Sequence, residues 1–97
     1  MSRSTGNPIL EKIRAGRAVN VFCAGNFATP RAIDFLAGSG KFDVIWFDLE
    51  HFALPIPELA ILNMIARGHG VGTIARVKAA DYQEVMRILE TGVNGIM

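Results

Sequence analysis

The sequence predicts an α/β fold in which strands and helices alternate around a parallel sheet. Stretches rich in β-branched and aromatic residues alternate with amphipathic stretches that start at capping residues and end at glycines. The predicted strands begin near Val19, Val44, Thr73 and Gly95, so the repeat is about 25 residues, the size of a strand–helix unit. The segment 44–47 is continuously apolar on both faces, as expected for a central parallel strand covered by helices.

A short helix is predicted ahead of the sheet. Asn7 can cap it, Pro8 suits its first position and Gly16 can follow its end. The segment 19–24 is predicted to be the first strand because it is rich in β-branched and aromatic residues. The second helix is predicted to begin after Thr29, a capping residue followed by proline.

The middle of the chain continues the alternation. We predict the second strand over 42–49 and the third over 71–77. The helix between them has Pro57 near its start and ends at Gly68 to Gly70.

The last predicted helix follows the cap Asp81, and Gly92 ends it. The spacing of its apolar residues predicts that Val85, Met86 and Leu89 face the core. A fourth strand then begins, and the sequence ends at residue 97.

Composition excludes several classes of protein. Hydrophobic residues make up 51% and charged residues 20% of 97 residues, which fits one globular domain and excludes disorder. A net charge of +1 gives no reason to expect a nucleic acid partner. The chain has no apolar run near the roughly 20 residues that cross a membrane, and its polar start "MSRSTGNP" lacks a signal-peptide core. We therefore expect a cytoplasmic protein. Cys23, the one cysteine, is expected to be buried and inert.

The polar residues that interrupt the apolar strands define a candidate site. Asp48, Glu50 and His51 follow the second strand, and Arg76 ends the third. The carboxyl ends of parallel strands meet at one edge of a sheet, where α/β enzymes place their reactive groups. His51 can exchange a proton near neutral pH, and Arg76 can bind a carboxylate or oxyanion. The two acids could orient the histidine or reach a metal-bound water.

Four stretches resemble the opening of the HpcH/HpaI aldolase family, namely "NPILEKIRAGRAV", "FDVIWFDLEH", "TIARV" and "ILETGVNGIM". Together they extend over nearly the whole chain. The resemblance implies a metal-dependent class II aldolase, a carbon–carbon lyase that reversibly cleaves 4-hydroxy-2-oxo acids. The products are pyruvate, or a related 2-oxo acid, and an aldehyde. Such enzymes are oligomeric (β/α)8 barrels, so a homo-oligomer is expected.

A complete (β/α)8 barrel needs about 250 residues, so the alternatives are a small open α/β sheet or part of a barrel. We favour a partial TIM barrel. On this interpretation, residues 1–97 are the N-terminal part of a single aldolase barrel domain. They form an N-terminal helix, about three βα units and the start of a fourth strand.

The resemblance also implies roles for individual residues. His51 matches the family's catalytic histidine, which moves protons together with a metal-bound water. Arg76 matches the arginine that binds the 2-oxo acid and steadies its enolate. Asp48 and Glu50 match the acids that flank the histidine, and we assign Asp48 to catalysis and Glu50 to substrate binding.

The complete enzyme is expected to use a divalent metal, Mg²⁺, Mn²⁺ or Co²⁺. The family's metal-binding glutamate and aspartate have no match in this sequence, so we expect no metal ligand within the chain and little activity from the chain alone. Phe52 stands where relatives usually have glycine, and Cys23 stands where they often have tryptophan.

Other interpretations remain at this stage. Arg76 could be a structural ion-pair partner of Asp48 or Glu50, and His69 is expected to be a surface residue or a helix cap. Trp46 and Phe47 are expected in the core or against a helix. The alternative to an enzyme is a non-enzymatic half-barrel module that self-associates or pairs with another chain through its open sheet edges. A reading frame that continues with the missing carboxylates would favour the aldolase.

Overall fold

The protein is described here by a computed structural model that covers residues 7–77 and 81–97. Its elements in chain order are α1 (Pro8–Arg14), β1 (Val21–Cys23), the 3-10 turn η1 (Gly25–Phe27), α2 (Pro30–Gly38), β2 (Val44–Asp48), α3 (Ile56–Gly68), β3 (Gly72–Arg76), α4 (Tyr82–Glu90) and β4 (Gly95–Ile96). Among the described residues, none of the helices combines the length and the apolar character that a membrane span requires.

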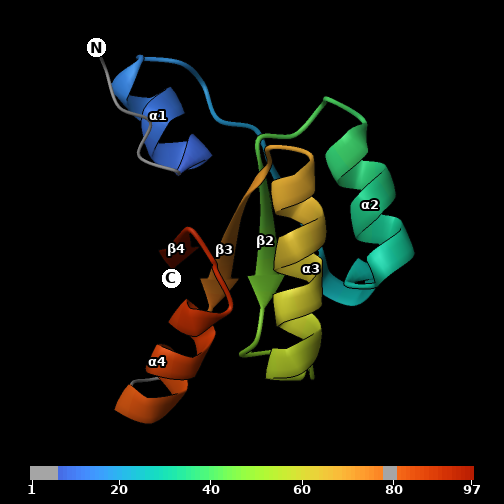
Figure 1. Ribbon diagram of the computed structural model, residues 1–97, viewed down its shortest axis with the longest axis vertical. Coiled ribbons are helices and arrows are strands. Elements are labelled where there is room, and N and C mark those ends of the chain that lie inside the picture. Colours follow the sequence, from blue (N-terminus) through green and yellow to red (C-terminus); the bar gives the residue numbers. More distant parts are fainter. Residues whose placement is uncertain (1–6, 78–80) are drawn as a thin grey trace.

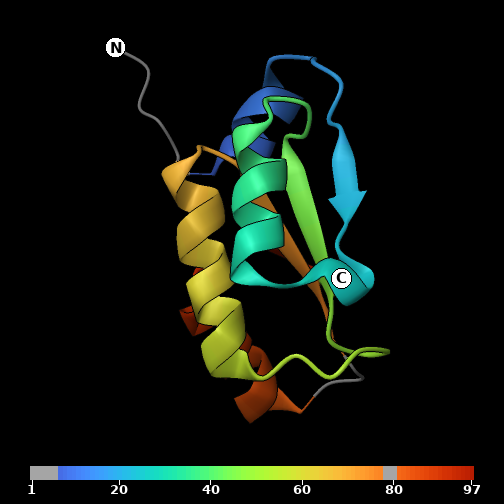
Figure 2. The ribbon, with the colours of Figure 1, turned by 90° about the vertical axis from the view of Figure 1, so that its right-hand side faces the viewer.

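The four strands form one parallel sheet in the order β1-β2-β3-β4. Figure 1 shows β2 and β3 pointing the same way with α3 next to β2, and Figure 2 shows β1 at the edge of the sheet beside β2. The predicted α/β fold with a parallel sheet is therefore confirmed. So is the internal position of β2, which pairs with β1 on one side and β3 on the other.

The helix starts are held by the predicted capping residues. The side chain of Asn7 accepts hydrogen bonds from the backbone N–H groups of residues 9 and 10, and Thr29 accepts one from residue 32. Asp81 does the same for residue 83 at the start of α4. Each cap satisfies backbone donors that have no partner within the helix, which explains where these helices begin.

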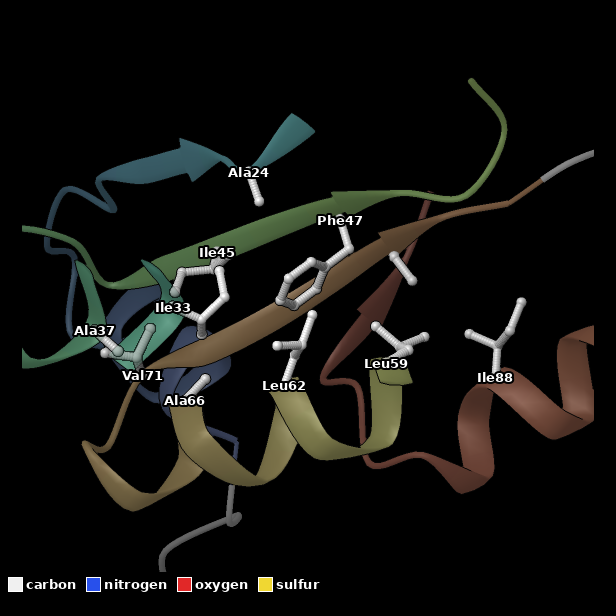
Figure 3. Close-up of a cluster of buried hydrophobic side chains, with 11 residues drawn as sticks. Ala24, Ile33, Ala37, Ile45, Phe47, Leu59, Leu62, Ala66, Val71 and Ile88 are labelled. Atoms are coloured by element: carbon white, nitrogen blue, oxygen red, sulfur yellow. The ribbon is translucent and has the colours of Figure 1, made fainter. Parts of the chain in front are cut away.

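The core lies between the sheet and the helices α2 and α3. Ile45 and Phe47 of β2 point toward Leu62 and Ala66 of α3, while Ile33 comes from α2 (Figure 3). All five residues are at most 1% exposed. Because strand side chains alternate between faces, the residues between them, such as Trp46, lie on the opposite face of the sheet.

Two expectations about burial were wrong. Cys23 is exposed rather than buried, because its partner in the register is Trp46, on the face away from the helices, and β1 has a neighbouring strand on one side only. In α4 the buried residue is Ile88, whereas Met86 and Leu89 are 40% and 47% exposed. Helix α4 precedes β4, an edge strand of only two residues. Of the residues of α4, Ile88 alone is buried in the core.

The predicted boundaries differ most at β1. Pairing begins at Val21 rather than at Val19 because the preceding residue is engaged elsewhere. The carbonyl of Asn20 accepts hydrogen bonds from the N–H groups of Asp43 and Val44, and its own N–H donates to the Asp43 carboxylate. The strand therefore starts where this turn contact ends.

Helix α1 lies at the end of the sheet from which the strands start (Figure 1). None of its residues is fully buried. Asn7 donates a hydrogen bond to the carbonyl of Asn94 at 3.1 Å, and Lys12 forms an ion pair with Asp43. Ile9 lies so close to Gly72 that a β-carbon there would be 2.5 Å from the isoleucine side chain. The helix is thus attached to the sheet by a few discrete contacts.

Candidate functional site

The structure brings the four predicted site residues together at the carboxyl edge of the sheet. Asp48 ends β2 and is paired in register with Arg76, which ends β3. Glu50 and His51 lie in the turn that leaves β2, at the same end as both arrowheads in Figure 1. The expected proximity therefore follows from the parallel arrangement of β2 and β3.

Asp48 organises the turn. Its Oδ1 accepts hydrogen bonds from the backbone N–H groups of Glu50 at 2.9 Å and His51 at 3.1 Å. Its Oδ2 lies 3.0 Å from Nδ1 of the His51 ring. The side chain of Asp48 is 7% exposed and that of His51 is 55% exposed. A buried carboxylate thus holds an accessible imidazole by both backbone and side chain.

Hydrogen bonding sets the charge of Asp48. Burial alone would raise the pKa of this carboxyl, but the hydrogen bonds from His51 and Glu50 together outweigh burial and lower the pKa below its ordinary value of 3.8. Asp48 is therefore ionised at neutral pH and can only accept hydrogen bonds. It follows that Nδ1 of His51 carries a proton, which leaves Nε2 to exchange protons. Nε2 lies 3.3 Å from Oε1 of Glu50.

The Arg76 guanidinium faces both acids without a close hydrogen bond to either. Its nitrogens lie 3.8 Å from Oδ2 of Asp48 and 3.7 Å from Oε1 of Glu50. These distances permit electrostatic attraction but exceed hydrogen-bond length. The side chain is 35% exposed, so its donors can still reach a bound anion.

Trp46 is a neighbour of the site that the sequence interpretation missed. The Arg76 guanidinium carbon lies 5.7 Å from the centre of the Trp46 ring, within the range of a cation–π contact. The indole Nε1 is buried and has no hydrogen-bond partner in the described part of the chain. Trp46 precedes Asp48 by two residues, and strand alternation therefore places both side chains on one face of the sheet. This spacing in the sequence could have predicted that Trp46 lies near the site. Phe47 occupies the core as expected.

Two further residues that the sequence singled out have different surroundings, His69 at the far end of α3 and Phe52 in the turn directly after His51. His69 is at the C-terminal end of α3, where its Nε2 is 2.7 Å from Oδ1 of Asp34, in agreement with a helix cap on the surface. Phe52 is 37% exposed, and its ring lies 3.8 Å from where a β-carbon on Gly25 would be.

The residues that the structure describes do not fit a catalytic metal. Among the residues that the structure describes, no group of three or more His, Cys, Asp or Glu side chains could hold an ion. Both carboxylate oxygens of Asp48 are already engaged by His51 and the turn backbone. The site as it stands combines an accessible imidazole, a partly exposed guanidinium and two carboxylates.

The lowered pKa of Asp48 predicts acid sensitivity. The unfolded chain binds more protons than the folded chain at pH values around and between the folded pKa and the ordinary value of 3.8. The stabilisation by Asp48 is therefore complete above about pH 5 and is lost as the pH falls through the folded pKa. Asp48→Asn should make the unfolding free energy less dependent on pH between about 5 and 2. Urea unfolding at several pH values measures this, and equal pH slopes for both proteins would contradict it.

Comparison with known proteins identifies relatives through structure. No family model and no curated protein matches this chain. The crystal structure of an HpcH/HpaI aldolase from Desulfitobacterium hafniense DCB-2 matches with a TM-score of 0.84 and 28% identity, over 92% of this chain and 34% of that one. The citrate synthase SbnG matches at 0.79 and 28% identity, over 89% of this chain and 34% of its own. A variant of SbnG matches at 0.76 and 26% identity, over 91% of this chain and 36% of its own.

The chain thus spans about a third of the length of these solved structures. The similarity extends over nearly all of the chain, and it agrees with the motifs "FDVIWFDLEH" and "TIARV" that carry the resemblance in sequence. The chain is similar in fold to an HpcH/HpaI aldolase, and its parallel sheet with helices matches about a third of the length of that structure.

Proposed function

We propose that this chain is part of a metal-dependent aldolase that reversibly cleaves 4-hydroxy-2-oxo acids to pyruvate, or a related 2-oxo acid, and an aldehyde. The observation that carries the proposal is the contact between Nδ1 of His51 and the buried Asp48 carboxylate, with Arg76 at the same edge of the sheet. The relationship to an HpcH/HpaI aldolase supports it.

His51 is the proposed proton carrier. With Nδ1 directed at Asp48, Nε2 can accept the proton of the substrate 4-hydroxyl group. Removal of that proton forms the aldehyde carbonyl, breaks the bond between C3 and C4, and moves the electron pair to the 2-oxo oxygen as an enolate. Glu50 lies 3.3 Å from Nε2 and can accept a hydrogen bond from the protonated ring.

Arg76 is the proposed anion-binding group. Its guanidinium can donate two parallel hydrogen bonds to the substrate carboxylate or to the enolate oxygen. The nearby Asp48 and Glu50 hold the cation in place from distances beyond hydrogen-bond length, and Trp46 lies beside it. In the alternative interpretation Arg76 only neutralises these acids, and a variant at this position would then alter stability rather than substrate affinity.

The proposed enzyme also includes a divalent cation, Mg²⁺, Mn²⁺ or Co²⁺, whose ligands lie outside this chain. When bound, such an ion would polarise the 2-oxo acid as a Lewis acid. Assembly as a homo-oligomer in the cytoplasm is part of the same proposal. The isolated chain is expected to show little or no cleavage, since its described residues do not fit a metal.

A chimeric barrel tests the proposed function. Residues 7–97 replace the matching segment of the Desulfitobacterium hafniense aldolase, and pyruvate release from a 4-hydroxy-2-oxo acid is followed with lactate dehydrogenase. We expect release that requires a divalent cation and stops when the cation is chelated, and no release by the isolated chain. A chimera that melts cooperatively but releases no pyruvate would contradict the proposal. Cation-dependent cleavage by the isolated chain would contradict the assignment of the metal ligands to another segment.

A further inference from the structure

Trp46 lies on the face of the sheet opposite to the core, the face that also carries the candidate site. In the register of β2 and β3 it is paired with Ile74. Asp48, two residues further along β2, is paired with Arg76. Partners in register point to the same side, so Trp46 and Arg76 are diagonal neighbours on adjacent strands, within reach of aromatic and long side chains. The contact in the structure agrees, because the guanidinium carbon of Arg76 lies over the indole ring, 5.7 Å from its centre.

The indole of Trp46 is not explained by packing. Its side chain is only partly exposed, and its Nε1 atom is buried. In the described part of the chain, this N–H group has no hydrogen-bond acceptor. A buried donor without an acceptor lowers stability, whereas a hydrocarbon side chain at the same place would carry no such cost. Among aromatic rings the indole attracts cations most strongly, and a cation lies over its face.

Two carboxylates attract the same guanidinium. The nitrogens of Arg76 are 3.8 Å from Oδ2 of Asp48 and 3.7 Å from Oε1 of Glu50, and both distances are longer than a hydrogen bond. A guanidinium and a carboxylate that bind each other directly are about 2.7–2.9 Å apart. Since both pairs are open and 35% of the side chain is exposed, the N–H groups of Arg76 stay available to another anion.

We propose that Trp46 is a positioning residue, whose ring holds the Arg76 guanidinium away from direct hydrogen bonds with the two acids and so keeps its N–H groups free for a substrate carboxylate or enolate. The inference deepens the anion-binding role of Arg76 and rests on the proposed function. Without the ring, the guanidinium would close on Asp48 and Glu50, and an incoming carboxylate would have to displace them. The consequence is weaker substrate binding with unchanged proton transfer at His51.

Proton NMR of the full chain tests the position of the guanidinium without any substrate. An aromatic ring shields protons over its face, so the side-chain signals of Arg76 should lie upfield of those of Arg14, which is exposed. Trp46→Leu should move the Arg76 signals downfield, and Trp46→Phe, which keeps a ring, should move them less. Phe35→Leu is the matched control, since it removes an exposed ring on α2 and should leave them unchanged. Arg76 signals that coincide with those of Arg14, or that do not respond to Trp46→Leu, would overturn the proposal.

Steady-state kinetics of the chimeric barrel test the consequence for binding. Trp46→Leu should raise KM for the 4-hydroxy-2-oxo acid by about three- to tenfold, the range that a cation–π contact supports, and should change kcat by less than about twofold. Trp46→Phe should restore most of the affinity because a ring is present again. Added to Arg76→Gln, Trp46→Leu should have no further effect on KM, since the group through which it acts is gone. A loss in kcat with KM unchanged would overturn the positioning role.

Loss of the proposed function and loss of the positioning role give different results. A folded chimera that releases no pyruvate contradicts the proposed function, and the NMR signals of Arg76 in the full chain then still decide whether the ring positions the guanidinium. An active chimera in which Trp46→Leu leaves KM unchanged agrees with the proposed function and overturns the positioning role of Trp46.

Discussion

In the chimeric barrel, His51→Ala should lower kcat for pyruvate release by about 10²–10⁴-fold, the usual contribution of a positioned general acid–base group. The imidazole is held by the Asp48 carboxylate at 3.0 Å, and alanine removes the proton carrier while leaving that carboxylate in place. The backbone N–H of residue 51 still donates to Asp48, so the turn should persist. Initial rates at saturating substrate measure the change.

The other histidine is a matched control for this substitution. His69 ends α3 and contacts Asp34, at the end of the sheet opposite the site. His69→Ala removes an imidazole of the same chemistry and should change kcat by less than about twofold, because it can alter only stability. Full activity of His51→Ala would remove His51 from the mechanism, and equal losses in the two variants would point to a general defect in folding.

The sequence was sufficient to predict the elements whose signals are local. Asn7, Thr29 and Asp81 were assigned as caps because a short polar side chain before a helix has one main structural use, and each accepts backbone hydrogen bonds as expected. The strand at 44–47 could be placed because a short uninterrupted apolar run is typical of a buried strand, although helices α2 and α3 pack on the face of Ile45 and Phe47 and Trp46 lies on the other face. These inferences need no knowledge of neighbouring elements.

Burial on α4 and β1 depends on neighbours, and here the sequence pattern was insufficient. Val85, Met86 and Leu89 have the spacing of a buried stripe, but Ile88 makes the core contact because α4 meets the sheet only at its edge. Cys23 is in a strand that pairs on one side. A hydrophobic period shows which residues share a face, whereas burial also requires a partner for that face.

For the candidate site, the sequence predicted which residues meet but not how they are connected. Parallel pairing was enough to bring Asp48 and Arg76 to one edge. The double capping of the turn by the Asp48 carboxylate, and the position of Trp46 beside the guanidinium, depend on turn geometry and rotamers. Catalytic roles for these residues stay predictions, and the chimera tests them.

In the isolated chain, Phe47→Ala should lower the unfolding free energy by about 3–5 kcal/mol, the usual cost of removing a buried phenylalanine side chain. Phe47 is fully buried, and its ring points from β2 toward Leu62 of α3 (Figure 3). Its removal leaves a cavity between the central strand and the long helix, where the packed backbone can relax only partly. For a domain whose total stability is about 5–15 kcal/mol, this is a large fraction.

Phe35→Ala is the matched control, since Phe35 lies on α2 and is 76% exposed. The same side chain is removed, but most of its surface is already in contact with water, so the unfolding free energy should change by less than about 0.5 kcal/mol. Urea midpoints for the two variants and the parent chain, compared at equal protein concentration, measure both values. Similar losses in the two variants would mean that the face of α2 carrying Phe35 is covered in solution. A small loss in Phe47→Ala would mean that the sheet and α3 do not form one cooperative core.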